Sequence, residues 1–315
     1  MPRLCPYLLL RARRIDPLLP SLLRVTRTLD SATNELRWLS AHAAAATATA
    51  ADSAKATLRS CVYRRSTLAE PLQYILGNQP FGPTSILCRR GVLIPRAETE
   101  ELASHLAGLL PRASKVVDLC TGSGCIPLLL AAETDVSVVG VDISSHALRL
   151  SMENLQRNAD VMRAASQVQF MEGDVLAQNG EEDDLLYSIH ACFDEMVPGY
   201  TNADVVISNP PYISADGYAR ETARSVRNWE PRLALEAADR GDVFYPRIGE
   251  IARGLGARAV VTEVGGWTQA ERVKGIWEEM GWEGSAIWKD FAGRGRTVVA
   301  WRDGGEWVAE GPNPT

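Results

Sequence analysis

The chain has 315 residues, of which 46% are hydrophobic and 23% charged, and this suits one large domain with or without a small one. The formal net charge of −6 excludes a chain-wide basic field for nucleic acid, and no apolar run approaches the roughly 20 residues of a membrane span. The six cysteines form no C-x-x-C pair and the four histidines are scattered, so we expect neither a metal site nor a disulfide scaffold, and a reducing compartment.

The N-terminal segment contains a candidate targeting sequence. The stretch PYLLLRARRI at residues 6–15 is rich in arginine and leucine and free of acidic residues, which is typical of a mitochondrial presequence within residues 1–25. The other reading is an amphipathic helix of an N-terminal domain. We therefore predict a mitochondrial location, with the cytoplasm as the alternative.

A small helical domain is predicted over residues 1–70, since residues 30–70 hold alanine, leucine and charges in a helical rhythm. No cluster of acidic or basic residues occurs in it, so it is better suited to binding a partner than to catalysis. Glycine and proline then alternate with β-branched and aromatic residues, which indicates a β-hairpin linker at 71–93. A helix is expected over 98–110, with acidic residues in its first turn.

Strand and helix patterns alternate through the C-terminal domain, predicted to span residues 94–315. The strands are expected at 115–119, 136–143, 168–174, 203–209, 257–265 and 296–302. Alternation of this kind predicts an α/β fold with a mostly parallel sheet, which binds ligands at the carboxyl ends of its strands. Residues 178–203 interrupt the rhythm with an acidic run, and we expect a solvated insertion there.

The segment VVDLCTGSGC at 116–125 is the first candidate site. A strand carrying Asp118 runs into Thr121, Gly122, Ser123 and Gly124, where glycines let the backbone approach a ligand closely. A dinucleotide motif would have a third glycine at position 127, which is proline here. The alternatives are the amino-acid moiety of S-adenosylmethionine (AdoMet) and a ligand-free tight turn.

Two more acidic residues end strands. Asp142 follows the next predicted strand and is placed to accept hydrogen bonds from both hydroxyls of a ribose. Its alternative role is to cap a helix, but Ser144 can do so. Asp174 is placed either at the edge of an adenine pocket or in a simple turn.

The segment SNPPYIS at 208–214 leaves the sheet abruptly. Two prolines stiffen the residues after the strand, and Asn209, Pro210, Pro211 and Tyr212 should face the same cleft as the preceding motifs. An amide nitrogen is a poor nucleophile because its lone pair is delocalised. The Asn209 side-chain oxygen and the Pro210 carbonyl can accept from an amide NH2 and stabilise the charge that develops on it, while Tyr212 provides a flat wall.

Several motifs together resemble one methyltransferase family. VVDLCTGSGCIPLLLA, GVDIS, MEGD and ISNPPYI look like class I AdoMet-dependent methyltransferases that act on nitrogen. PLQYILGNQPFG, LIPRAETEEL, WEPRLAL, EVGGWTQ and KDFAGRGR are similar to the HemK/PrmC family, which methylates the glutamine N5 of translation release factors. The resemblance runs from about Glu35 to Trp301.

The resemblance implies a Rossmann-like seven-stranded sheet, with AdoMet as cofactor and the glutamine of a Gly-Gly-Gln motif as the methyl acceptor. It implies that the N-terminal domain binds a class I release factor, with no direct nucleic acid and a monomeric enzyme. The implied AdoMet-binding residues are Asp118, Cys120, Thr121, Gly122, Ser123, Gly124, Asp142, Asp174, Val175 and Asn209. Asn209, Pro210 and Tyr212 are implied to be catalytic, and the same three with Pro211 to bind the glutamine.

Some residues depart from the family pattern. The family usually has glycine at position 120, where this chain has cysteine, and the turn should survive if the φ angle of Cys120 is negative. It usually has proline at position 97, which is alanine here. EAADRGD at 236–242 lacks the usual pair of glycines, but this stretch is expected to be a surface turn. The alternative function is methylation of nucleic-acid amino groups, since those enzymes share the NPPY sequence.

Overall fold

The computed structural model describes residues 4–46, 51–177, 184–220 and 222–311. It divides the chain into two compact units, which are described separately. Unit 1 comprises Met1–Asn78 and Ala223–Trp229, and unit 2 comprises Gln79–Thr222 and Glu230–Thr315. The predicted helical segment ended at residue 70, whereas the first unit extends to residue 78 and takes in a short segment from the second half of the chain.

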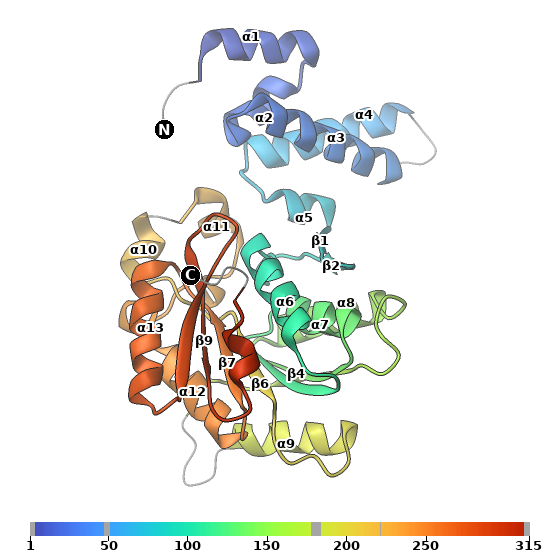
Figure 1. Cartoon of the computed structure of the whole chain (residues 1–315). Helices are drawn as coiled ribbons and strands as arrows, with labels where there is room; N and C mark the ends of the chain where they lie inside the picture. Colours follow the sequence, from blue (N-terminus) through green and yellow to red (C-terminus); the bar gives the residue numbers. More distant parts are fainter. Residues whose placement is uncertain (1–3, 47–50, 178–183, 221, 312–315) are drawn as a thin grey trace. The chain divides into compact units, whose positions relative to one another are not determined.

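Unit 1 is helical (Figure 1). Its helices are α1 (Pro6–Ile15), α2 (Leu19–Thr26), α3 (Leu29–Ala46), α4 (Ala51–Ser66), α5 (Leu72–Leu76) and α11 (Arg224–Trp229). The arginine-rich segment forms α1, in which Ala12 is fully buried, and α2 contributes Leu19, Leu22 and Leu23 to the same apolar core. The Trp229 indole donates to the carbonyl of Leu68 at 3.1 Å, which ties α11 to this unit.

Unit 2 contains a seven-stranded sheet of order β5-β4-β3-β6-β7-β9-β8 and a two-stranded hairpin. The sheet strands are β3 (Ser114–Leu119), β4 (Val136–Asp142), β5 (Gln167–Glu172), β6 (Val205–Ser208), β7 (Ala259–Glu263), β8 (Gly284–Lys289) and β9 (Gly295–Trp301). The first five pair in parallel, and β9 runs antiparallel to its neighbours. The sequence predicted this mostly parallel sheet but missed β8.

The hairpin predicted within residues 71–93 is present. It pairs β1 (Asn78–Phe81) with β2 (Thr84–Leu87), and Phe81 and Ile86 are fully buried. The connection from β2 to α6 (Ala97–Leu109) is held by a side-chain amide: Gln79 Nε2 donates to the carbonyl of Pro95 at 2.9 Å.

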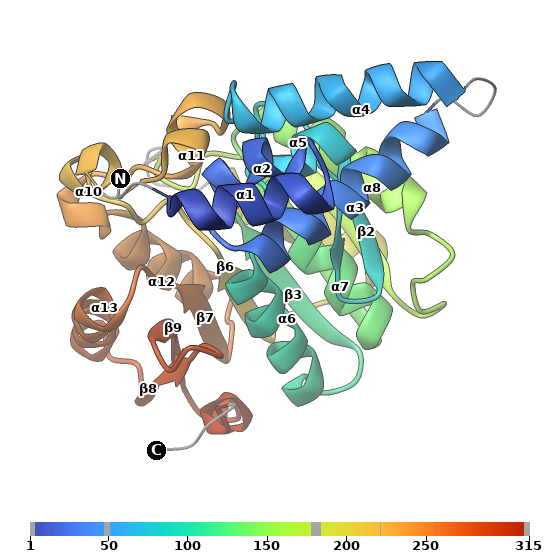
Figure 2. The ribbon, with the colours of Figure 1, turned by 90° about the horizontal axis from the view of Figure 1, so that it is seen from above.

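Helices cover both faces of the sheet (Figures 1 and 2). Alternate strand residues point to opposite faces, so Val116 packs in the layer of α6 and α7 (Cys125–Glu133), and Val117 packs in the layer of α9 (Asp184–Met196), α12 (Phe244–Gly254) and α13 (Trp267–Glu279). The remaining helices of unit 2 are α8 (Ser145–Arg157), α10 (Ala215–Arg220) and the short 3₁₀ segments Arg232–Ala234, Asp239–Gly241 and Glu306–Ala309.

The prediction of a solvated insertion at 178–203 is wrong for the part of it that the structure describes. Residues 178–183 lie outside the described residues, but α9 follows them and buries Ile189 and Phe193 completely against the sheet. The acidic composition at the start of the segment concealed an apolar helical stripe at 185, 189, 193 and 196.

The strand register brings the ends of four strands level. Leu119 is paired with both Val141 and Ser208, and Ser208 is paired with Thr262. Cys120, Asp142, Asn209 and Glu263 are each the next residue along, so they line up across one edge of the sheet. This is the edge at which parallel α/β sheets bind ligands.

Candidate active site

A cavity of about 380 Å³ opens at this edge of the sheet, which is within the size range of small-molecule sites. Eight of the predicted site residues line it: Cys120, Gly122, Ser123, Asp142, Asp174, Val175, Asn209 and Pro211. Five others do not: Asp118, Thr121, Gly124, Pro210 and Tyr212. The motifs therefore converge on one cavity, as predicted, but part of each motif serves to support its walls.

The turn after β3 is built on left-handed backbone. Gly122 has φ 58° and Gly124 φ 77°, and a side chain at Gly124 would collide with Phe170 at 2.8 Å. Apart from Gly122 itself and its two chain neighbours, no atom of the described residues lies within 4 Å of the place where Gly122 would carry a Cβ, so its backbone is open to a ligand. Gly124 then caps α7, whose N-terminus begins at the cavity wall.

Cys120 also adopts left-handed backbone, with φ 62°. The condition under which the turn was expected to tolerate a cysteine, a negative φ, is therefore not met. A non-glycine residue in this region carries a conformational penalty on the order of 1 kcal/mol. The side chain packs partly against the core beneath the sheet, and its surface contributes to the cavity.

Asp142 joins three parts of the site. Its carboxylate accepts from the backbone N–H of Gly122 at 2.8 Å and from that of Ser144 at 2.8 Å. Burial raises the pKa of the Asp142 carboxyl, and these two N–H groups oppose the rise. The helix cap is Ser144, whose hydroxyl accepts from the N–H of Ala147, so the carboxylate of Asp142 keeps lone pairs for a ligand on the cavity side.

Asp118 lies behind the cavity wall and is fully buried. Among the described residues, neither of its carboxylate oxygens has a hydrogen-bond partner, and the same is true of the Thr121 hydroxyl. Burial raises the pKa of the Asp118 carboxyl to about 8; the nearby Thr121 hydroxyl opposes this rise, and the charge of Asp142 adds to it. Since the ionised form is costly here, a bound cation would favour it.

The far end of the cavity is apolar. Val175 is buried, while Ile143 and Leu176 keep exposed apolar surface at the rim. Asp174 sits in a turn in which its Oδ1 accepts from the N–H of Leu176 at 2.9 Å. Both readings of Asp174 thus have a structural basis, because the same residue makes a turn and lines the cavity.

These features fit AdoMet. An aromatic base suits the apolar end, a ribose diol suits the carboxylate of Asp142, and the positively charged sulfonium and ammonium suit the acidic wall near Asp142 and Asp118. The open backbone at Gly122 allows close approach of the ligand's amino-acid part.

The NPPY segment (residues 209–212) is held in place from several sides. The backbone of Ile213, the next residue, exchanges hydrogen bonds with Leu235 and Ala237, both at 2.9 Å. The Gln269 side-chain amide donates to the carbonyl of Tyr212 at 3.2 Å. Asn209 itself donates from Nδ2 to the Thr99 hydroxyl at 2.9 Å. The segment therefore presents Asn209 to the cavity on a fixed backbone.

The stretch 236–242 is only in part the surface turn that was expected. Residues 238–240 are exposed, but Gly241 and Asp242 are buried beneath the NPPY segment. A Cβ on Gly241 would lie 2.1 Å from the carbonyl oxygen of Tyr212. Asp239 and Arg240 have φ values of 50° and 57°, so this stretch holds two non-glycine residues in the left-handed conformation.

Sequence reasoning missed other residues at the cavity. Arg96 lines it and is paired with the buried carboxylate of Glu230 at 2.8 Å, which also accepts from the N–H of Ile94. Thr99 lines it from the first turn of α6. Both come from the LIPRAETEEL motif, in which no local feature of the sequence distinguishes these two residues as part of a site.

Two kinds of feature do not occur in the described part of the chain. No group of three or more histidine, cysteine or acidic side chains is arranged to hold a metal ion there. Within the same residues, no helix combines the length and the hydropathy that crossing a membrane requires.

Comparison with known proteins gives consistent results. The model of the Methyltransferase small domain matches residues 97–226. The probable MRF1 mitochondrial N(5)-glutamine methyltransferase mtq1 of Schizosaccharomyces pombe is 37% identical over 248 residues, which cover 74% of this chain and 75% of the relative. The mitochondrial MRF1 N(5)-glutamine methyltransferase MTQ1 of Saccharomyces cerevisiae is 32% identical, with 75% and 68% covered. The release factor glutamine methyltransferase of Bacillus subtilis is also 32% identical, with 73% and 75% covered.

Proposed function

Because the chain belongs to the family of release factor N5-glutamine methyltransferases, we propose that it methylates the side-chain amide nitrogen of the glutamine in the Gly-Gly-Gln motif of a class I release factor. The observation that carries this proposal is the position of Asn209. It lines the AdoMet-type cavity and is held there by a rigid segment and by a hydrogen bond to Thr99.

AdoMet, when bound, supplies the electrophilic methyl group. The chain's own residues have to hold the acceptor nitrogen and stabilise the charge that grows on it. An amide NH2 has two hydrogens, and we assign the Asn209 side-chain oxygen, which belongs to a cavity-lining residue, to accept one of them. The carbonyl of Pro210, which lies between the lining residues Asn209 and Pro211 but does not itself line the cavity, is assigned to accept the other once the substrate is bound. As the methyl group moves to the nitrogen, its bond to the sulfonium sulfur would break. The methylated nitrogen would then be strongly acidic and would give its extra proton to water, so no base of near-neutral pKa is needed.

Tyr212 and Pro211 take supporting parts in this proposal. Pro211 lines the cavity, and both prolines are buried, which limits movement of the segment. The Tyr212 hydroxyl is bound to Glu263 at 3.1 Å, and the Arg296 guanidinium lies 5.4 Å from the centre of its ring. Because Tyr212 does not line the cavity, we assign its fixed ring to support of the segment, in place of the flat wall that the sequence suggested.

The cofactor assignments follow the same cavity. We propose that Asp142 binds the ribose and that Cys120, Gly122 and Ser123 contact the amino-acid part. Asp174 and Val175 border the base. Asp118, Thr121 and Gly124 do not line the cavity, and we assign them to its support and electrostatics.

We propose that unit 1 binds the release factor, that the enzyme acts as a monomer, and that it works in mitochondria. The names of the two yeast relatives and the acid-free, arginine-rich α1 support the compartment. Removal of residues 1–25 would delete Leu19, Leu22 and Leu23 from a core, so we expect the imported protein to retain α2. Fractionation of a C-terminally tagged protein tests this, and a purely cytosolic location would contradict it.

The activity test uses labelled AdoMet with a mitochondrial release factor, a cytosolic release factor and nucleic acid as separate acceptors. We expect one methyl group on the glutamine side chain, mapped by mass spectrometry, and none when the motif is Gly-Gly-Ala. Efficient labelling of nucleic acid, or equal labelling of the alanine version, would overturn the assignment.

A further inference from the structure

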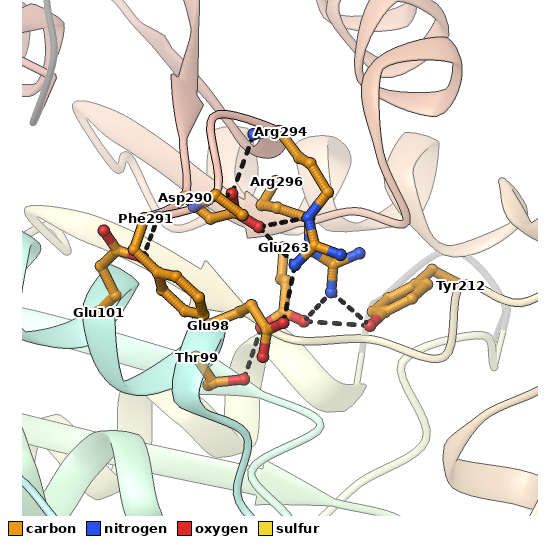
Figure 3. Close-up of polar contacts among 10 residues, drawn as sticks. Glu98, Thr99, Glu101, Tyr212, Glu263, Asp290, Phe291, Arg294 and Arg296 are labelled. Carbon is orange, nitrogen blue, oxygen red and sulfur yellow. Dashed lines mark hydrogen bonds and ion pairs between the residues drawn. The ribbon is translucent and has the colours of Figure 1, made fainter. Parts of the chain in front are cut away.

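A buried carboxylate lies one residue past the paired end of the strand beside Asn209. Glu263, at the end of β7, is fully buried and accepts hydrogen bonds at both oxygens (Figure 3). Its Oε2 accepts from the Thr99 hydroxyl at 2.6 Å. Its Oε1 accepts from the Tyr212 hydroxyl and from Arg296 Nη2, both at 3.1 Å.

The direction of the hydrogen bonds in this cluster determines whether Thr99 donates to Asn209 or accepts from it. A hydroxyl group has one hydrogen, and that of Thr99 is donated to the carboxylate of Glu263. Toward Asn209 the Thr99 oxygen can therefore only accept, and it does so from Nδ2 at 2.9 Å. The amide oxygen of Asn209 is left for the cavity.

We propose that Glu263 and Thr99 are positioning residues that fix which end of the Asn209 amide faces the substrate. The inference rests on the proposed function, since it matters only if the acceptor is an NH2 group. The two ends of an asparagine amide have nearly the same size, so packing cannot distinguish them. With its amide inverted, Asn209 would point its NH2 group at the NH2 group of the substrate. It could then not stabilise the charge that develops on the acceptor nitrogen.

The variant E263Q reverses the polarity while keeping the shape. Two donors, from Tyr212 and Arg296, face the Oε1 position, so the new amide places its oxygen there and its NH2 toward Thr99. The Thr99 hydroxyl then accepts from the new amide, and its own hydrogen loses the carboxylate that accepted it. The amide oxygen of Asn209 is a replacement acceptor, so we expect Asn209 to turn its oxygen toward Thr99 and its NH2 toward the cavity.

The variant T99V removes the connection without imposing the wrong orientation. We therefore expect E263Q to lower kcat by about 100-fold, the scale of losing one preorganised transition-state hydrogen bond, and T99V by about 10-fold or less. The double variant T99V/E263Q should be more active than E263Q alone, because Asn209 is no longer forced to invert. T99S, which keeps the hydroxyl, should recover most of the activity lost in T99V.

The matched control is T262V. Thr262 precedes Glu263 on the same strand, is fully buried, and its hydroxyl has no hydrogen-bond partner among the described residues. T262V makes the same change of atoms as T99V, so it measures the packing effect alone. We expect it to keep wild-type kcat, and all variants to bind AdoMet within about threefold of wild type, since a change in orientation of Asn209 costs little cofactor affinity.

Two measurements decide the inference: kcat on the release factor, and hydrogen exchange of the Asn209 side-chain NH2 by nuclear magnetic resonance. The NH2 should be protected in wild type and exposed in T99V and E263Q. Additive losses in the double variant, or protection unchanged in E263Q, would overturn the inference. If the exchange of the Asn209 NH2 follows this pattern in wild type and variants but the wild-type enzyme does not methylate the release factor, the proposed function is overturned and the orientation of Asn209 is not.

Discussion

The carboxylate of Asp142 accepts a hydrogen bond from the backbone N–H of Gly122 at 2.8 Å, which joins the end of β4 to the glycine-rich turn after β3. A second N–H, from Ser144, holds the other oxygen at 2.8 Å. The carboxylate is thus fixed by the backbone on both sides before any ligand binds. A preorganised acceptor loses little conformational entropy on binding.

We therefore expect D142A to weaken AdoMet binding by about 1–3 kcal/mol, the scale of lost hydrogen bonds to a charged group. Isothermal titration calorimetry measures this directly. The matched control is E172A. Glu172 lies on β5, where it pairs with Asp142 of β4, but it is exposed and does not line the cavity. Equal affinity of D142A and wild type would remove Asp142 from the ribose site.

Asp118 should make stability depend on pH. Burial raises its pKa to about 8, whereas an unfolded aspartate titrates at about 3.9. The folded chain therefore holds the proton more tightly, and this stabilisation is present below about pH 4 and is lost as the pH rises toward 8. Urea unfolding without AdoMet should show the free energy of unfolding of wild type falling across this window relative to D118N. Parallel profiles for the two proteins would contradict the assignment.

Cys120 allows a test of backbone strain. With φ at 62°, position 120 favours glycine over any residue with a Cβ. C120G should therefore be more stable than C120A by about 1 kcal/mol. Cys192 is the control because it lies in the interior of α9, where alanine should be more stable than glycine by about 1 kcal/mol. The same order at both positions, measured by chemical unfolding, would contradict the strain.

The strand ends were predictable because their signal is local. Runs such as residues 136–143 and 203–209 are rich in valine and isoleucine, and parallel pairing brings Asp142 and Asn209 to one edge, whereas Asp118 lies one residue before the end of its strand. The glycine-rich turn likewise follows from backbone chemistry. The positions of these residues could be predicted without knowing which distant residues they contact.

The rest depends on tertiary contacts. Thr99 and Glu263 are 164 residues apart in the sequence, and the sequence around each of them gives no indication that their side chains are hydrogen-bonded. The left-handed φ of Cys120 is imposed by the turn around it, against the preference of the residue. The burial of α9 was hidden because the acidic residues that precede it dominate the local composition.

Gly241 should be essential to the support of the NPPY segment. Its φ is 93°, and a Cβ there would lie 2.1 Å from the carbonyl oxygen of Tyr212. G241A must displace that carbonyl, so we expect a loss of more than about 2 kcal/mol in stability or a large loss of kcat. Gly281 is the control, because it also has positive φ, at 81°, but within the described part of the chain only Gly281 and its two chain neighbours come within 4 Å of the place where it would carry a Cβ. G281A with the same effect on kcat would show that backbone strain alone is responsible.

Asn209 is the sharpest test of the proposed chemistry. N209A removes the acceptor oxygen while leaving the cavity and the carboxylate of Asp142 in place, so we expect near-normal AdoMet affinity and a loss of kcat of about 100-fold or more. N209D keeps an acceptor but has no hydrogen for Thr99, whose own hydrogen is donated to Glu263. Two oxygens would then face each other without a proton, and a new charge would lie in the cavity. We expect N209D to bind cofactor and to methylate glutamine poorly. Calorimetry and single-turnover transfer separate the two effects, and wild-type transfer by N209A would exclude Asn209 from the reaction.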